Sequence, residues 1–409
     1  MAVLDRCYNI ADLRAAAQHR LPRGVFEFVD RGSEDEVALR NNRAGFERIK
    51  LKHRALVDVS GRSMATTLFG KPVGMPMAIA PTGAAGLCWH EGELELAKAA
   101  AKAKIPFTLA TSAMTSMEKI AEQAGPGVGG RLWFQLYVWN RRDLSYQLVE
   151  RAKAAGFEAL IVTVDTIVPP NREYNARNGF LLPFSPTARF TVDIMRHPSW
   201  AARVLLKYVT TIGMPRNENF PEPYRRRVTA NDPARDEVMR QDSLCWDDIK
   251  AFRKMWPGIL MLKGINRPDD AVKALEYGVD GIIVSNHGGR NMDSAVASID
   301  ALPDVAEAVG DRATVLLDSG VRRGSDIAKA LALGAKAVLT GRVTLYGTAV
   351  GGAEGAGKAI GIIRSELDKT MAYTGCCSVD EISTDIFFAD GPGNRLRDRV
   401  TVGRANGGD

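Results

Sequence analysis

The chain has 409 residues, of which 45% are hydrophobic and 25% are charged, and its formal net charge is +6. This is the composition of an ordinary globular protein, and it excludes a disordered or fibrous chain. The five cysteines show neither zinc-ligand spacing nor a disulfide framework, so we expect no metal site and a reducing compartment.

Residues 1–70 are predicted to form a helical preamble. Helical patterns cover 10–18 and 22–31, and an irregular stretch then leads to the first strand. The N-terminus lacks the charged-then-apolar pattern of a signal peptide, and no apolar run is long enough to cross a bilayer. We therefore expect a cytoplasmic protein.

Short apolar runs recur from residue 77 onward and alternate with helical patterns. The alternation predicts a parallel sheet, and eight strands favour a closed (β/α)8 TIM barrel over residues 71–375. No Gly-x-Gly-x-x-Gly follows the first strand, which argues against a dinucleotide-binding fold. The predicted strands are 77–80, 107–110, 132–137, 159–164, 259–262, 281–285, 314–318 and 337–340, and the helices between them include 91–104, 141–155, 268–277, 300–309 and 324–333.

A long insert, residues 177–240, follows the fourth strand. Within it, 177–227 hold nine Lys/Arg and three Asp/Glu, an excess equal to the net charge of the whole chain. Trp200, Val204 and Tyr208 recur at four-residue spacing, which predicts a short interfacial helix on an anionic membrane. The alternative is a solvated lid that packs on the barrel. An insert of this length in a compact fold is usually functional or mobile.

The C-terminal part is predicted to complete one domain that spans residues 1–409. Residues 354–373 read as a closing helix and 386–409 as a tail. The glycine-rich stretch 351–357 lacks the Lys-Ser/Thr ending of a phosphate loop, so we expect it to be a loop into the closing helix.

His287 and Arg290 follow the sixth strand, with two glycines between them. In a β/α barrel the catalytic groups stand at such strand ends. A base beside a fixed cation suits abstraction of a proton from a substrate that carries a carboxylate. The other strand ends also carry polar groups or glycines, namely Pro81, Thr82, Gly83, Gln135, Tyr137, Thr163, Asp165, Arg172, Lys263, Asp318, Gly320, Arg322, Gly341 and Arg342.

The loops after strands seven and eight are predicted to bind a phosphate. Glycines there permit close backbone approach, and Arg322 and Arg342 supply positive charge. Lys263 would then lie near an electron-poor ring at the barrel mouth and stabilise negative charge on it. Singly, Lys263 reads as a salt-bridge partner and Asp165 as a helix cap. Their occurrence together on one barrel rim indicates a functional site.

Taken together, these motifs resemble the FMN-dependent L-2-hydroxy acid oxidase and dehydrogenase family. The resemblance covers roughly residues 8–385 and is greatest to the (S)-mandelate and L-lactate dehydrogenases of that family. It rests on SNHGGR (285–290), LDSGVRRG (317–324), WFQLYV (133–138), ALALGA (330–335), PTG (81–83) and GRVTLYG (341–347).

The resemblance implies a role for each site residue. His287 would be the base, held as its imidazolium by Asp165. Arg172 and Arg290 would grip the substrate carboxylate, and Tyr137 would hydrogen-bond the substrate. The FMN ring would contact Gln135, Thr163, Lys263 and Ser285, with Lys263 at its N1/O2 edge, and the ribityl phosphate would contact Asp318, Gly320, Arg322, Gly341 and Arg342.

Two positions depart from the family pattern. Phe28 stands where relatives carry a tyrosine whose hydroxyl contacts the substrate carboxylate, and Ala110 stands where relatives often carry a serine. Thr111 or Ser112 would compensate for Ala110. These departures bear on the identity of the substrate more than on that of the cofactor.

The resemblance implies FMN-dependent oxidation of an (S)-2-hydroxy acid, mandelate-like or lactate-like, to the 2-oxo acid. The electrons would pass to a quinone or another membrane acceptor, or to oxygen. We expect a homotetramer without a nucleic-acid partner, attached peripherally to the inner face of the cytoplasmic membrane through 177–227. The alternatives are a Schiff-base lyase that uses Lys263 and a basic membrane or nucleic-acid adaptor.

Overall fold

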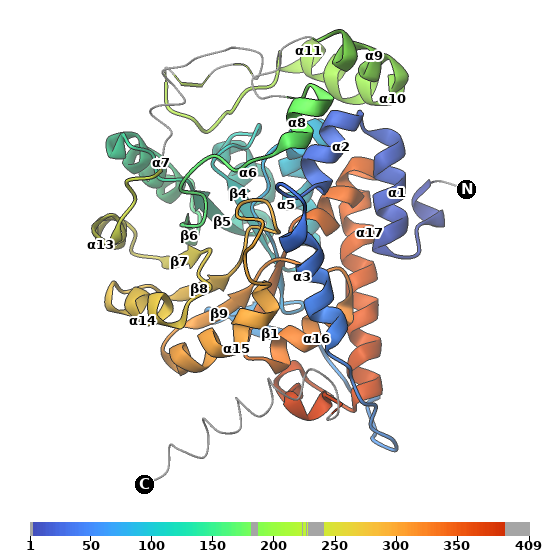
Figure 1. Ribbon diagram of the computed structural model, residues 1–409, viewed down its shortest axis with the longest axis vertical. Helices are drawn as coiled ribbons and strands as arrows, with labels where there is room; N and C mark the ends of the chain where they lie inside the picture. Colours follow the sequence, from blue (N-terminus) through green and yellow to red (C-terminus); the bar gives the residue numbers. More distant parts are fainter. Residues whose placement is uncertain (1–2, 181–186, 223, 226, 228–240, 389–409) are drawn as a thin grey trace.

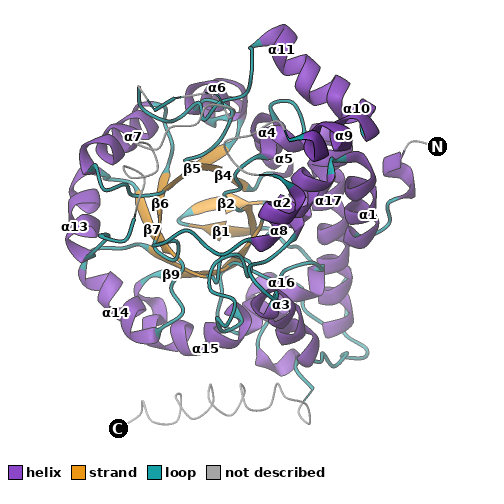
Figure 2. Ribbon diagram, turned by 45° about the horizontal axis from the view of Figure 1, so that its top comes forward, coloured by secondary structure: helices purple, strands orange, loops and turns teal. Residues whose placement is uncertain are grey.

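Eight parallel strands close into a barrel, as predicted (Figures 1 and 2). The computed structural model describes residues 3–180, 187–222, 224–225, 227 and 241–388, so parts of the predicted insert and most of the predicted tail lie outside it. Each predicted strand is present, and the ring closes where the last strand pairs with the first. The strands are β3 Met77–Ile79, β4 Pro106–Ala110, β5 Arg131–Leu136, β6 Ala159–Thr163, β7 Ile259–Lys263, β8 Gly281–Val284, β9 Thr314–Leu317 and β10 Ala337–Thr340.

The strands are buried on both faces, which explains their continuous apolar sequences. One set of side chains, including Trp133 and Met261, fills the barrel interior. A hairpin of β1 Thr66–Leu68 and β2 Lys71–Val73 lies against this interior core through Leu68 and Val73. The prediction of an irregular stretch before the first strand is therefore wrong for this hairpin. Its strands are only three residues long, which is too short to show an alternating pattern.

Helices surround the barrel in the alternating order that the sequence predicts. Most helix bounds lie within two residues of the expected ones. The helices on the barrel are α4 Ala85–Cys88, α5 Gly92–Ala103, α6 Met117–Ala124, α7 Arg142–Ala154, α13 Trp246–Met255, α14 Pro268–Glu276, α15 Ser298–Val309 and α16 Gly324–Ala332, with 3-10 turns at Pro126–Val128, Gly310–Arg312, Val379–Glu381 and Thr384–Ile386.

The closing helix α17, Arg342–Thr374, begins directly after β10 rather than at residue 354. Gly351 and Gly352 are not the expected loop but a kink within it. Gly352 has φ +58°, and a Cβ there would come within 2.9 Å of Trp89 Nε1. A side chain at this position would therefore be strained in the backbone and would clash as well.

The N-terminal helices bring Phe28 to the C-terminal mouth of the barrel. A 3-10 turn, Val3–Arg6, precedes α1 Ile10–Arg20, α2 Arg23–Asp30 and α3 Val37–Arg48. The link between α2 and α3 is tied to the loop after β8, because Ser33 N donates to Gly289 O at 2.9 Å. Asn42 and Asn286 exchange two side-chain hydrogen bonds of 2.8 Å in the same region. The end of α2 is thereby fixed over the barrel.

Helices at the start of the insert and within it lie beyond one side of the barrel mouth (Figure 1). They are α8 Glu173–Asn178, which begins just before the insert, α9 Ala188–Arg196, α10 Pro198–Trp200, a π-helical segment Ala201–Leu206 and α11 Lys207–Thr211. In the part of the chain that the structure describes, no helix is both long and apolar enough to pass through a membrane.

Trp200, Val204 and Tyr208 are buried, so the prediction that they face a membrane is wrong. Trp200 Nε1 donates to Leu87 O at 2.7 Å, and the Tyr208 hydroxyl accepts from Glu91 N at 3.0 Å. Their four-residue spacing does put them on one face, but that face packs on α4 and the start of α5.

Candidate active site

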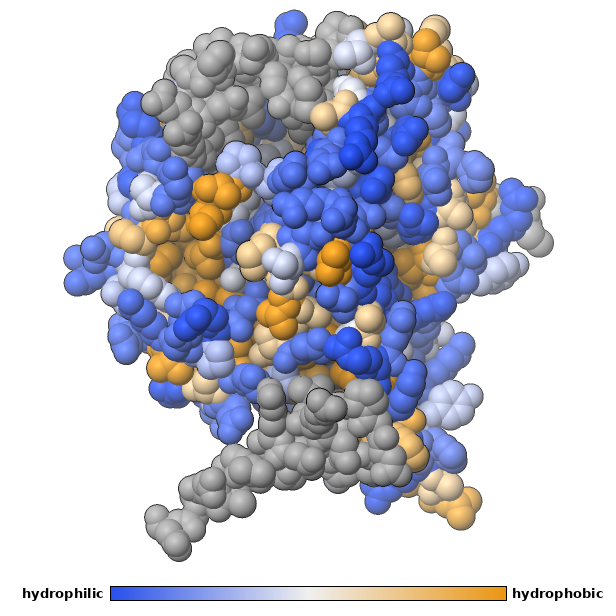
Figure 3. Space-filling view, in the orientation of Figure 1, coloured by the Kyte–Doolittle hydropathy of each residue, from blue (hydrophilic) through white to orange (hydrophobic). Residues whose placement is uncertain are grey.

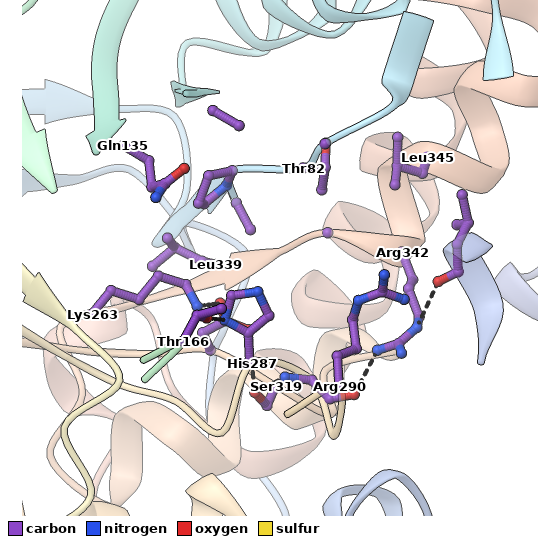
Figure 4. A pocket seen from close by; sticks show the side chains of 18 of the residues that line it. Thr82, Gln135, Thr166, Lys263, His287, Arg290, Ser319, Leu339, Arg342 and Leu345 are labelled. Atoms are coloured by element: carbon purple, nitrogen blue, oxygen red, sulfur yellow. Dashed lines mark hydrogen bonds and ion pairs between the residues drawn. The ribbon is translucent and has the colours of Figure 1, made fainter. Parts of the chain in front are cut away.

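A cavity of about 360 Å³ opens at the C-terminal mouth of the barrel (Figure 4). Its size is that of a small-molecule site. Most of the predicted site residues line it: Phe28, Pro81, Thr82, Gly83, Gln135, Tyr137, Arg172, Lys263, His287, Arg290, Asp318, Gly320, Arg322, Gly341 and Arg342.

Three predicted residues do not line the cavity but support residues that do. Thr163 accepts from Gln135 Nε2 at 2.9 Å, and Ser285 accepts from Lys263 Nζ at 2.9 Å. Asp165 accepts from the ring of His287. These supports fix the orientation of side chains that face the cavity.

His287 sits in a left-handed turn that aims its ring into the cavity. Its φ is +59°, the two following glycines also have positive φ, and its backbone N donates to Ser285 Oγ at 3.0 Å. Nδ1 lies 2.8 Å from Asp165 Oδ1, which requires the proton on Nδ1. The lone pair is then on Nε2, 3.4 Å from the Tyr137 hydroxyl. This is the form that a general base needs.

Electrostatics keep this pair as a neutral imidazole beside a charged carboxylate. Burial lowers the pKa of His287, and Asp165 opposes that effect only in part. Burial alone would raise the pKa of Asp165, but His287 and Lys263 lower it overall. Thr166, which the sequence analysis missed, donates from Oγ1 to Asp165 Oδ1 at 3.1 Å.

The guanidinium carbons of Arg172 and Arg290 lie 5.9 and 5.1 Å from the centroid of the Phe28 ring. Arg290 Nη1 donates to the carbonyls of Phe28 and Arg31 at 2.6 and 3.2 Å. The buried Nε of Arg172 has no partner among the described residues. Burial, and then Arg172, lowers the pKa of Arg290 to about 10. Two buried cations with donors to spare are suited to an anion such as a carboxylate.

Arg322 and Arg342 also line the cavity, and Figure 4 shows Arg342 near Arg290. Arg342 donates to the carbonyls of Val29, Gly288 and Arg31 at 2.9 to 3.0 Å, and Arg322 donates to Val321 O at 2.8 Å. Burial lowers the pKa of Arg322 to about 10. These hydrogen bonds run to backbone carbonyls, so the two positive charges are available to an anion.

Lys263 is held between two side chains of neighbouring strand ends. Its Nζ donates to Ser285 Oγ at 2.9 Å and lies 3.0 Å from Asp318 Oδ2. Burial alone would lower the pKa of Lys263, but Asp318 and Asp165 raise it overall. A charged ammonium is a poor nucleophile, which argues against the Schiff-base alternative.

Some lining residues had no sequence signal. Phe220 and Gln241 come from the insert region, far along the chain from any strand end. Phe220 is buried against Trp139, with ring centroids 5.0 Å apart, and Gln241 Oε1 is buried without a partner among the described residues. Only the folded insert brings these two side chains to the cavity.

The donor set fits FMN. One side of the cavity carries arginines that suit a phosphate, and another carries the neutral amide of Gln135 with the ammonium of Lys263, which suit a polar ring. Between them, Ala80 and Leu339 supply apolar contact. The division of charge matches a cofactor with a phosphate at one end and a heterocycle at the other.

Comparisons with known proteins agree with this donor set. The sequence profile of the FMN-dependent dehydrogenase family matches residues 17–389. (S)-Mandelate dehydrogenase of Pseudomonas putida is 38% identical over 387 residues, covering 95% of each chain. L-Lactate oxidase of Nostoc is 40% identical over 384 residues, covering 94% of this chain and 99% of that one. A crystal structure described as monotopic membrane protein (S)-mandelate dehydrogenase superimposes with a TM-score of 0.86 at 38% identity, covering 94% and 99% of the two chains.

Proposed function

This chain belongs to the FMN-dependent dehydrogenase family and oxidises 2-hydroxy acids with FMN as its cofactor, and we propose that its substrate is an (S)-2-hydroxy acid with an apolar or aromatic side chain, as in mandelate. The observation that carries this proposal is the position of the Phe28 ring beside both cavity arginines. The ring offers an apolar surface to the substrate and no hydroxyl to the carboxylate.

We assign the base to His287. Its Nε2 accepts the proton that the substrate loses, and Asp165 stabilises the imidazolium that results, because its carboxylate lies 2.8 Å from Nδ1. Burial raises the pKa of Tyr137, so its hydroxyl stays protonated and donates a hydrogen bond to the substrate. Lys263 offsets negative charge at the cofactor ring.

We assign the substrate carboxylate to Arg172 and Arg290. Both guanidinium groups line the cavity on the same side as Phe28, and two-pronged hydrogen bonds between guanidinium and carboxylate are strong and directional. A carboxylate held there directs the rest of the substrate toward His287.

When bound, FMN supplies the acceptor for the two electrons of the oxidation. We propose that Gln135 and Lys263 hold its ring, and that Thr163 and Ser285 keep these two side chains in place. Loop 81–83 lies along the same cavity, and its backbone would cover the cofactor. The ribityl phosphate would be held by Asp318, Gly320, Arg322, Gly341 and Arg342.

A direct test of the substrate class is anaerobic mixing of the holoenzyme with glycolate, L-lactate and (S)-mandelate. We expect the ratio of the rate constant for flavin reduction to the substrate Kd to be highest with (S)-mandelate. A preference for glycolate would overturn it.

We also propose that the segment α9–α11 attaches the enzyme to an anionic membrane. A quinone or another acceptor in that membrane would then take the electrons from the enzyme. The supporting observation is a set of exposed apolar side chains on this segment, with Arg189, Arg196 and Lys207 nearby in sequence. Figure 3 shows apolar atoms at the upper right edge, where Figure 1 places α9 and α11. The exposed apolar residues are Val192, Met195, Leu206, Val209 and Ile212.

The mandelate dehydrogenase to which this chain is similar is described as a monotopic membrane protein, which supports attachment without a spanning helix. We propose oxygen as the alternative electron acceptor, and a homotetramer as the assembly. Oxygen consumption during turnover and sedimentation velocity test them.

A further inference from the structure

We propose that Tyr174 is a positioning residue for the substrate carboxylate, which it serves through Arg290. The inference rests on the proposed function of the Arg172–Arg290 pair and adds a residue that does not line the cavity itself. Tyr174 is the second residue of α8, which packs against α2 beside the cavity mouth (Figure 1).

Tyr174 is buried and carries a hydroxyl without a hydrogen-bond partner among the described residues. A buried hydroxyl left unpaired lowers the stability of the fold. Phenylalanine would fill the same space without that cost. We infer that a group beside the hydroxyl aligns with it when the site is loaded.

Arg290 is the partner that the surroundings favour. Tyr174 lies near enough to Arg290 to oppose the lowering of the Arg290 pKa by burial and by Arg172, although the two groups are not aligned as a hydrogen bond. Tyr174 opposes the lowering of the Arg172 pKa by burial in the same way. The guanidinium carbon of Arg31 lies over the Tyr174 ring, 5.4 Å from its centroid, so the ring is held among cations.

Arg290 needs such a restraint because its described hydrogen bonds use one nitrogen. Nη1 donates to the carbonyls of Phe28 and Arg31, and the neighbouring Phe28 ring offers no oxygen. A hydroxyl that accepts from a second nitrogen fixes the plane of the guanidinium. The remaining donors then face the cavity as a fork that matches a carboxylate.

The test is Tyr174→Phe in the FMN-loaded enzyme, measured with a charged and a neutral substrate. We expect the KM for (S)-mandelate and the Kd for phenylacetate to rise about three- to tenfold, the usual worth of one hydrogen bond. The kcat should stay within about twofold. The KM for mandelamide (2-hydroxy-2-phenylacetamide), which has no carboxylate, should not change. Tyr146→Phe, a tyrosine that packs on Phe252 in the outer helices, is the matched control.

A second variant separates a role through Arg290 from a general packing role. In an Arg290→Lys background, Tyr174→Phe should add no further loss, because the lysine lacks the planar fork that Tyr174 orients. Three results would each overturn the assignment: an unchanged Kd for phenylacetate, an equal loss for acid and amide, or a full additional loss in the Lys background. Failure of the proposed function would appear instead in the parent enzyme, as a flavin that no 2-hydroxy acid reduces.

Discussion

Asp165 Oδ1 lies 2.8 Å from Nδ1 of His287, although the two residues are 122 positions apart in the chain. They follow β6 and β8, and β7 with Lys263 lies between those strands. The contact selects the tautomer with its lone pair on Nε2. Burial at the same time keeps the ring neutral. The pair is therefore ready to accept a proton and to stabilise the charge that follows.

Replacing the base should stop the reaction without releasing the cofactor. For His287→Ala we expect flavin reduction by substrate to fall about 10²–10⁴-fold, the usual contribution of a general base. FMN should stay bound, because His287 is not among the residues assigned to its phosphate or its ring. Stopped-flow absorbance under anaerobic conditions measures the rate, and the spectrum before mixing reports the FMN content. Near-parent reduction in this variant would refute the assigned role.

The pH profile should show an inflection below pH 6.5. The pKa of His287 lies below its ordinary value of 6.5 because of burial, so the neutral base persists to lower pH and kcat/KM is lost only as pH falls through that lowered pKa. Asp165 opposes the lowering, and Asp165→Asn should therefore move the inflection to still lower pH while it reduces the rate. An inflection above 6.5 in the parent would contradict this account.

The Phe28 ring should set the preference for the substrate side chain. Phe28→Tyr adds a donor beside the carboxylate site, and one such hydrogen bond is worth about 0.5–1.5 kcal/mol. We expect the KM for glycolate and L-lactate to fall and the preference for mandelate to weaken. The comparison is flavin reduction with the three acids in both enzymes. If the ranking of the three acids and their rates of flavin reduction are unchanged, Phe28 only fills space in the wall of the cavity and does not set the substrate preference.

Binding to vesicles should depend on charge and on the exposed apolar side chains of α11 and its neighbours. Co-sedimentation should be stronger with anionic than with neutral vesicles and should fade with salt, because each Lys or Arg near the surface contributes about 1 kcal/mol. Leu206→Glu and Val209→Glu should weaken it, since both side chains are more than half exposed.

Leu56→Glu provides the control for the vesicle experiment. Leu56 is an apolar residue that is fully exposed, but it lies between α3 and β1 rather than on the insert. Binding that is equal on neutral and anionic vesicles, or equally weak in all three variants, would count against attachment through α9–α11.

The sequence predicted the barrel because parallel strands such as 159–163 are buried on both faces and appear as unbroken apolar runs. It predicted the site because polar groups such as Lys263 and His287 interrupt that apolar pattern at strand ends, where the fold brings them together. The positions of β1 and β2 escaped prediction, since Leu68 and Val73 are buried against the interior core of the finished barrel.

The insert marks the limit of sequence periodicity. The spacing of Trp200, Val204 and Tyr208 identifies an apolar helix face but not its partner, which is the barrel. The same holds for Phe220, which reaches the cavity through long-range packing against Trp139. Tyr174 carries no motif, and only its buried, unpaired hydroxyl draws attention to it.

The central claim is that this chain binds FMN and uses His287 to oxidise an (S)-2-hydroxy acid. The most direct test is to record the absorption spectrum of the purified protein, identify the chromophore released on denaturation, and mix the anaerobic holoenzyme with (S)- and (R)-mandelate. We expect a flavin spectrum, FMN as the released chromophore, and bleaching by the (S) enantiomer alone. A colourless protein that FMN does not reconstitute, or a flavin that (S)-2-hydroxy acids leave oxidised, would contradict the claim.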